Sequence, residues 1–210
     1  LLWNKKIPDT ISGFSRFVVE GHTSICDRNG KLLIYTNNNY VYNGNHQLIT
    51  RIIGGESSTM TLIVPQPGND SLYYIFHPEA VFNINTDNTP RNLRYSIINI
   101  NGNNKQGSVV QLNKILLTGS SEKVTGIKHC NNNDWWIIGL TAIDEKFNSW
   151  LLTDTGLVTI PSFAGYSGNV NHLFPFNTQN IGYLKPSHNG ALIAEVTHPW
   201  VTELHHFNPS

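Results

Sequence analysis

The chain has very little cysteine: its 210 residues contain two, Cys26 and Cys130. Neither belongs to a CxxC motif or to a Cys/His group at the spacing of zinc ligands. We therefore expect two half-buried thiols rather than a bridge between them, and neither a metal site nor a disulfide scaffold. Glycine-rich phosphate loops are missing as well, since neither Gly54-Gly55 nor Gly102 stands in a P-loop or dinucleotide pattern, so no cofactor is expected.

An excess of one charge and long apolar runs are also absent. Lys plus Arg and Asp plus Glu number 14 each, so the formal net charge is zero. Binding to nucleic acid needs a basic face that such a chain cannot easily assemble. The longest apolar runs, such as residues 135–140, are far shorter than the roughly 20 residues that cross a bilayer. Nucleic acid and membrane insertion are therefore excluded from the expected partners. The first residues show no signal-peptide pattern, so either the chain is cytoplasmic or a leader lies outside it.

Helical periodicity is nearly absent, and short runs rich in Val, Ile, Tyr, Thr and Trp recur between Asn, Gly and Asp turns. The same succession of segments, namely strand, turn, apolar strand, turn and strand, occurs four times along the chain. The predicted strands are residues 23–26, 31–36 and 40–42, then 60–64, 71–76 and 93–100, then 126–130, 135–140 and 149–153, then 181–185, 191–196 and 202–207. A fourth strand is predicted for the first three units at 46–52, 108–117 and 157–161.

Four strands per unit, repeated four times, predict an all-β fold, namely a β-propeller with four consecutive four-stranded blades. The predicted blades are residues 20–53, 56–118, 122–163 and 179–210, after an irregular segment at 1–13. The fourth blade lacks its outer strand, and this leaves two alternatives. Either residues 14–19 supply that strand and close a four-bladed ring, or the chain is part of a larger propeller.

A Glu-x-x-Thr motif stands ahead of the first strand in three units, and Gln179 takes the corresponding place in the fourth. The first strand of each blade lines the central channel of a propeller, so the three Glu residues are expected near one mouth of it. There they could bind a hard cation or a polar ligand, although hydrogen bonds to the neighbouring blade explain them more simply. Together with neighbours on the first strands, the candidate ligand site at this mouth is Glu20, His22, Glu56, Glu122, Lys128 and His129.

Aromatic residues are expected mainly in the core between blades, where bulky side chains are needed. Trp150 and Trp200 stand near turns and are the candidates for exposed rings that stack on sugars. The loop at residues 77–91 is long for a blade turn and rich in Asn and Thr, so it is the best candidate for a recognition loop.

Eight segments of the chain are distinctive, and they are residues 20–36 (EGHTSICDRNGKLLIYT), 41–46 (VYNGNH), 57–68 (SSTMTLIVPQPG), 73–76 (YYIF), 93–97 (LRYSI), 122–129 (EKVTGIKH), 135–137 (WWI) and 182–190 (GYLKPSHNG). In these segments the chain resembles the N-terminal β-propeller of gliding-motility-associated surface proteins of Bacteroidetes, which the type IX secretion system exports and which carry a type B sorting domain. The resemblance covers nearly the whole chain after about residue 15. It implies a propeller within a longer exported protein, an extracellular or cell-surface location, and no catalytic residues.

Two functions are compatible with these features. The favoured one is a non-enzymatic binding or scaffold module that engages protein or glycan through propeller loops. The alternative is a carbohydrate-active or other hydrolytic propeller, for which Glu20 and Glu122 are the one carboxylate pair that the repeat offers. No catalytic residue is assigned, because Ser24, Ser57 and Ser58 lack the context of a nucleophile elbow.

Overall fold

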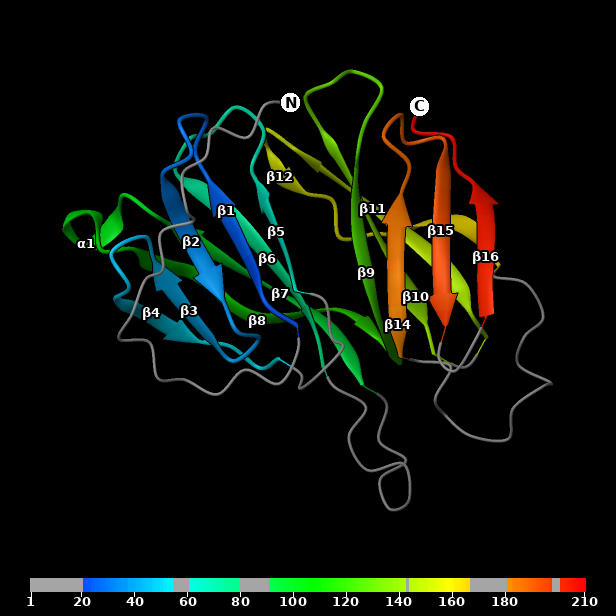
Figure 1. Ribbon diagram of the computed structural model, residues 1–210, viewed down its shortest axis with the longest axis horizontal. Coiled ribbons are helices and arrows are strands. Elements are labelled where there is room, and N and C mark those ends of the chain that lie inside the picture. The colour runs from blue at the N-terminus through cyan, green and yellow to red at the C-terminus, as the bar shows by residue number, and fades with distance from the viewer. Residues whose placement is uncertain (1–20, 55–60, 80–90, 143, 167–180, 198–200) are drawn as a thin grey trace, which may run out of the picture.

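The computed structural model describes residues 21–54, 61–79, 91–142, 144–166, 181–197 and 201–210. These residues form four antiparallel sheets, which follow one another along the chain and stand in a row (Figure 1). We number them sheet 1 to sheet 4. No helix in the described ranges is long and apolar enough to span a bilayer.

Sheets 1 and 2 are four-stranded meanders in which each strand pairs with the next one along the chain. Sheet 1 consists of β1 (Thr23–Cys26), β2 (Leu32–Thr36), β3 (Tyr40–Asn43) and β4 (Leu48–Arg51). Sheet 2 consists of β5 (Leu62–Pro65), β6 (Leu72–Pro78), β7 (Asn92–Asn99) and β8 (Ser108–Thr118). Between β7 and β8 lies the short turn α1 (Gly102–Lys105), in which Asn103 and Asn104 have left-handed backbone angles.

Sheets 3 and 4 repeat the meander with different outer edges. Sheet 3 consists of β9 (Ser120–Lys128), β10 (Trp135–Thr141), β11 (Lys146–Thr153), β12 (Gly156–Leu157) and β13 (Ser162–Tyr166). Both β12 and β13 pair with β11. Sheet 4 consists of β14 (Gly182–Pro186), β15 (Leu192–Thr197) and β16 (Val201–His206).

The abundant Asn and Asp residues form the turns between these strands. In each case the side-chain oxygen accepts a backbone N–H a few residues further on, which closes the turn before the next strand begins. The accepting residues are Asp27, Asn37, Asn43, Asn69 and Asn131. The turn chemistry predicted from the sequence is therefore present in sheets 1, 2 and 3.

The all-β prediction is confirmed, and two predicted strands need correction. The third unit does not begin with a strand at 126–130, because β9 starts at Ser120 and contains Glu122 and Thr125 of the Glu-x-x-Thr motif. Its outer edge is not a strand at 157–161, because β12 ends at Leu157 and β13 begins at Ser162. The proposed closing strand at 14–19 lies outside the described residues.

Three hydrophobic cores fill the spaces between successive sheets. The core between sheets 1 and 2 contains Ile34, Val41, Ile52, Ile63, Tyr73, Ile75 and Ile98. The core between sheets 2 and 3 contains Val64, Tyr74, Phe76, Leu93, Tyr95, Val124, Ile137, Trp150 and Leu152. The core between sheets 3 and 4 contains Ile127, Ile138, Leu140, Phe147, Leu184 and Ile193. Alternate residues of one strand enter different cores, as the period of two along a strand requires.

The first strands of the four sheets are neighbours in space. β1 contacts β5, β5 contacts β9, and β9 contacts β14. In the described ranges no extensive contact joins β14 back to β1, and the two strands belong to opposite ends of the row (Figure 1). The described sheets therefore form an open row with their first strands along one side.

Candidate functional site

The structure separates the residues predicted at the channel mouth. Glu20 and Glu56 lie outside the described residues. His22 is exposed just ahead of β1, whereas Glu122 is 2% exposed near the start of β9. Lys128 lies at the other end of that strand, six residues from Glu122, and six residues of strand span about 20 Å. Glu122 and Lys128 therefore do not belong to one ligand site.

Of the two tryptophans proposed for sugar stacking, Trp150 is the one that the structure describes, and it is not exposed. Trp150 is fully buried in the core between sheets 2 and 3, where its ring lies against Gly139 of β10. Its proximity to a turn in the sequence was misleading, because β11 runs through the middle of sheet 3 and buries this position. Trp200 lies outside the described residues. The loop proposed for recognition is described only at its ends, since residues 80–90 lie outside the described part.

A pocket does form around two of the predicted residues, Lys128 and His129. It lies between the β9–β10 turn and the β14–β15 turn and has a volume of about 340 Å³. We call it the turn pocket. Its lining residues are Gly126, Ile127, Lys128, His129, Cys130, Asn132, Trp135, Pro186, Ser187, His188, Asn189, Gly190 and Pro209.

Hydrogen bonds fix the walls of the turn pocket. The Asn131 carboxamide accepts the backbone N–H groups of Asn133 and Asp134, at 2.9 and 3.0 Å. On the opposite wall, the Ser187 hydroxyl accepts the backbone N–H of Leu192 at 3.0 Å. The carbonyl of Pro209 accepts the indole N–H of Trp136 at 3.0 Å, which holds the residues after β16 against sheet 3. The pocket is thus held in place by strands of two sheets.

Among the described residues, the lining of the turn pocket includes several hydrogen-bond donors and no carboxylate. The Lys128 ammonium lies 4.1 Å from the centre of the Trp135 ring and also donates to the carbonyl of Asn133. Partial burial lowers the pKa of Lys128, and the nearby Asp134 carboxylate opposes this shift. His129 accepts the backbone N–H of Asn131 at Nδ1, so its other ring nitrogen carries the proton. Such a site favours ligands that offer oxygen acceptors.

Both cysteines are exposed, so the prediction of half-buried thiols is wrong. Cys26 is the last residue of β1, and Cys130 follows β9 in the wall of the turn pocket. The Cys130 sulfur lies 3.6 Å from Nδ1 of His129. Their exposure follows from their place at strand ends, where the chain leaves the core.

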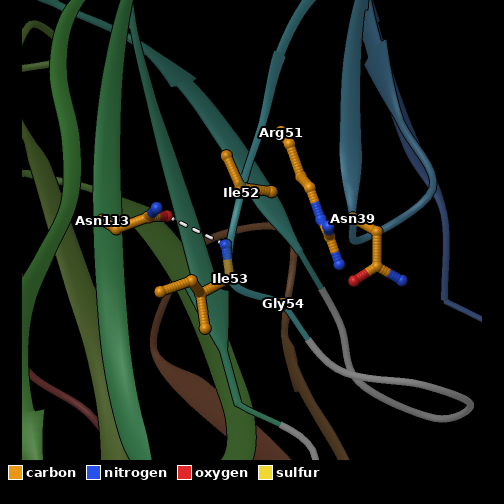
Figure 2. A pocket seen from close by; sticks show the side chains of 6 residues that line it. All are labelled: Asn39, Arg51, Ile52, Ile53, Gly54 and Asn113. Carbon is orange, nitrogen blue, oxygen red and sulfur yellow. Dashed lines mark hydrogen bonds between the residues drawn. The ribbon is translucent and has the colours of Figure 1, made fainter.

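A second pocket of about 300 Å³ lies between sheets 1 and 2 and is lined by Asn39, Arg51, Ile52, Ile53, Gly54 and Asn113. Figure 2 shows the Asn113 carboxamide reaching across to the backbone N–H of Ile53, at 2.9 Å. Behind it, the Ile53 carbonyl accepts a hydrogen bond from Nδ1 of His77 at 2.7 Å, and Ser96 donates to Nε2 of the same ring at 3.0 Å. The backbone N–H of Asn113 completes the circuit by donating to the Ser96 hydroxyl at 3.0 Å.

His77 is fully buried in this circuit. Its pKa is lowered to about 4, mainly by burial and also by the charge of Arg94, while the hydrogen bond to the Ile53 carbonyl and the charge of Glu79 act in the opposite sense. The ring is therefore neutral at pH 7, with one nitrogen donating and the other accepting. Hydrogen bonds with His77 and Ser96 thus hold Ile53 and Asn113, two lining residues of the second pocket, in place.

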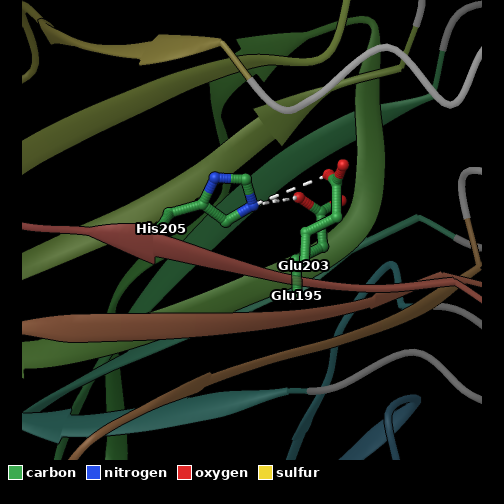
Figure 3. A group of neighbouring side chains, drawn as sticks. All are labelled: Glu195, Glu203 and His205. Atoms are coloured by element: carbon green, nitrogen blue, oxygen red, sulfur yellow. Dashed lines mark ion pairs between the residues drawn. The ribbon is translucent and has the colours of Figure 1, made fainter.

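A third polar group lies between sheets 3 and 4. Lys123 of β9 is completely buried, and its Nζ contacts Glu195 Oε1 at 2.7 Å and the Thr197 hydroxyl at 2.6 Å. Beside this pair lie Glu203 and His205 of β16 (Figure 3). The His205 Nε2 atom is 3.3 Å from Glu195 Oε2 and 3.8 Å from Glu203 Oε2.

Glu145, in the turn between β10 and β11, belongs to the same polar group and is 5% exposed. Burial raises the pKa of its carboxyl, the Glu195 and Glu203 carboxylates raise it further, and Lys123 partly offsets them. Like charges are therefore crowded at this interface.

The sequence reasoning missed His188, Asn113 and the whole group around Glu195. One local signal was available, since Glu203 and His205 are two apart and so share a face of any strand. Their pairing with Glu195 depends on the register of the β15–β16 hairpin, which no motif in the sequence specifies.

No protein-family model matches the chain, and no curated protein sequence matches it either. The chemistry of these pockets is therefore the basis for any functional conclusion.

Proposed function

We propose that the four sheets are four consecutive blades of a β-propeller, and that the chain is a non-enzymatic binding module of an exported bacterial surface protein. Three features support the propeller. Each sheet is an antiparallel meander, the first strands of successive sheets are neighbours, and the sheets pack face to face through separate cores. The absence of extensive contact between β14 and β1 in the described ranges favours a larger propeller over a four-bladed ring.

The turn pocket is the observation that carries the binding function. It opens between the turns of adjacent blades, where propellers present their loops, and its walls supply the Lys128 ammonium and the imidazoles of His129 and His188. A ligand with several oxygen acceptors satisfies these donors, as the hydroxyl and carboxylate groups of a glycan do. We therefore favour a glycan over a protein as the occupant of this pocket.

The hydrolytic alternative has less support. Acid–base cleavage of a glycoside needs two carboxylates that flank the bond. No carboxylate is found among the described residues that line the turn pocket and the second pocket. Glu122, one half of the carboxylate pair expected from the sequence, is 2% exposed and has polar contacts of its own. A buried, partnered carboxylate cannot reach a sugar in solution.

A glycan array tests the proposal. The wild-type chain is expected to bind a set of glycans, and Lys128→Met and His188→Ala are each expected to weaken that binding about tenfold or more. Lys185→Met and His206→Ala are the matched controls, because both residues are exposed on strands of sheet 4 outside the pocket lining. Equal binding by all four variants would remove the turn pocket from the proposal.

Turnover on the same glycans separates binding from hydrolysis. We expect no release of reducing sugar by the wild-type chain and no effect of Glu122→Gln on glycan binding. Release that is lost in Glu122→Gln would establish the hydrolytic alternative instead. The proposed surface location is tested separately, by labelling intact cells that express the complete parent protein with an antibody against sheet 1.

A further inference from the structure

The polar group between sheets 3 and 4 has the composition of a metal site. Glu195 of β15 is directly opposite Glu203 of β16 in the hairpin register, and His205 is two residues further along β16. All three side chains therefore lie on the same face of sheet 4, the one that carries Ile193 and Thr197 toward sheet 3. One ligand atom from each of them lies within 4.8 Å of the other two (Figure 3).

The distances suit a small divalent ion. Zn²⁺ binds imidazole nitrogen and carboxylate oxygen at about 2.0–2.2 Å, and a tetrahedral arrangement sets such ligand atoms roughly 3.4 Å apart. His205 Nε2 is 3.3 Å from Glu195 Oε2 and 3.8 Å from Glu203 Oε2. The ligand atoms of all three residues lie within 4.8 Å of one another, so they must draw closer together to surround one ion.

The His205 nitrogen that faces the carboxylates has no hydrogen bond. Its Nε2 atom is inaccessible to solvent, and no contact within the described residues meets hydrogen-bond geometry. The ring itself is held edge-on against Phe147 of β11, with the ring centres 4.9 Å apart. A buried ring nitrogen that is fixed in place and aimed at two carboxylates is in the arrangement that a metal ion completes.

Charge gives an independent reason for a cation. Three carboxylates, those of Glu145, Glu195 and Glu203, act electrostatically on one another here. Among the described residues, the lysine that pairs with this group is Lys123. The Lys123 ammonium occupies Glu195 Oε1 and leaves Glu195 Oε2 on the side of His205. Glu195 and Glu145 are 1% and 5% exposed, and buried charges are unfavourable unless they are paired.

We propose that Glu195, Glu203 and His205 bind one Zn²⁺ ion between sheets 3 and 4. Carboxylate and imidazole ligands together exclude Ca²⁺ and Mg²⁺ as the preferred ions, because these take oxygen ligands, whereas Zn²⁺ accepts both kinds. In this proposal all three ligands belong to sheet 4, and Phe147 of sheet 3 packs against the ring of the His205 ligand. This inference does not depend on the proposed binding function.

Calorimetric titration of chelator-treated protein with Zn²⁺ tests the site. We expect saturable binding of one ion, at least tenfold weaker binding in Glu203→Gln and His205→Ala, and much weaker binding of Ca²⁺. His206→Ala is the matched control, since His206 is the next residue of β16 and is exposed on the opposite face. Unchanged binding in both ligand variants, or loss of binding in His206→Ala, would mean surface binding and would overturn the proposal.

Two further measurements keep the test independent of folding. Glu203 and His205 are partly exposed, so their variants are expected to keep the far-ultraviolet circular dichroism of the wild type. Co²⁺ in place of Zn²⁺ is expected to give visible d–d absorption that His205→Ala abolishes. Zn²⁺ should also raise the melting temperature of the wild type and leave that of His205→Ala unchanged. Absence of a Co²⁺ spectrum and of any Zn²⁺-dependent shift would show a charge network that holds no metal.

Discussion

Sheets 2 and 3 are covered on both faces, whereas sheet 4 has one face that no described sheet covers. Every residue of β6 after the first is buried, because Tyr73 and Ile75 enter one core while Tyr74 and Phe76 enter the next. In sheet 4, β14 alternates between buried and exposed residues, and Tyr183, Val196 and Leu204 are exposed on the outer face. The position of a sheet in the row thus decides whether its strands are uniformly or alternately apolar.

The two interfaces that flank sheet 3 also differ in chemistry. Aromatic and aliphatic side chains, such as Trp150 and Phe76, fill the space toward sheet 2. Toward sheet 4, a smaller apolar core is accompanied by the buried Lys123, Glu195 and Thr197. A substitution in an apolar interface lowers stability through lost packing, whereas a substitution in a polar interface lowers stability when it leaves a buried charge unpaired. The following substitutions separate these two sources of stability.

Trp150→Ala is expected to have the largest effect, a loss of about 4 kcal/mol of unfolding free energy, because it empties the core between two sheets that are both covered. Urea unfolding followed by circular dichroism measures it. Tyr183→Ala on the outer face of sheet 4 is the control, with an expected change below about 0.5 kcal/mol. Similar losses in the two variants would mean that the outer face is covered in solution.

Lys123→Met is expected to cost about 3 to 4 kcal/mol, because it leaves the Glu195 carboxylate buried without its ammonium partner. The double variant Lys123→Met with Glu195→Leu should recover most of this loss, since it removes both charges. Urea unfolding in the presence of a chelator makes the comparison independent of any metal. Lys128→Met in the exposed part of the same strand is the control and should change stability little. No recovery in the double variant would contradict the charge argument.

His77 makes the interface between sheets 1 and 2 sensitive to acid. Its pKa is lowered from 6.5 to about 4 in the folded chain, so the unfolded chain binds the proton more readily between these pH values. The contribution of His77 to stability is therefore complete above pH 6.5 and is lost as the pH falls toward 4. The loss amounts to about 3 kcal/mol.

The pH dependence is measured by urea unfolding at several pH values between 7 and 4. His77→Gln should remove most of this part of the slope, whereas His206→Gln, at an exposed position, should keep it. If His77→Gln retains the wild-type slope, the proton uptake belongs to another group.

Much of the fold was predictable from the sequence, because β-branched and aromatic runs between Asn and Gly turns specify strands locally. Strands β2, β6, β7, β8 and β10 lie where such runs predicted them. The start of β9 was not predictable in the same way, because Ser120, Ser121, Glu122 and Lys123 are polar and look like a turn. They are buried as a strand because the Lys123 ammonium finds Glu195 and Thr197 on sheet 4, more than 70 residues away.

The candidate sites were predictable only where they are local. Lys128 and His129 mark one wall of the turn pocket, but the opposite wall at His188 is brought there by the packing of β14 against β9. Trp150 was a candidate for an exposed ring because it is near a turn in the sequence, although its side chain packs in the core between sheets 3 and 2. Burial of this kind depends on sheet order, which a single sequence does not reveal.

Leu204→Thr is expected to have the smallest effect and sharpens the comparison most. Leu204 is 69% exposed on β16, the edge strand of sheet 4 in the described ranges, and threonine keeps the strand propensity of that position. If this face is open, the unfolding free energy changes by less than about 0.5 kcal/mol. If a further blade or a second copy covers the face, the apolar contact is lost and the change exceeds about 1 kcal/mol. Unfolding at two protein concentrations separates these cases, because cover by a second copy makes the midpoint depend on concentration, whereas cover within one chain does not.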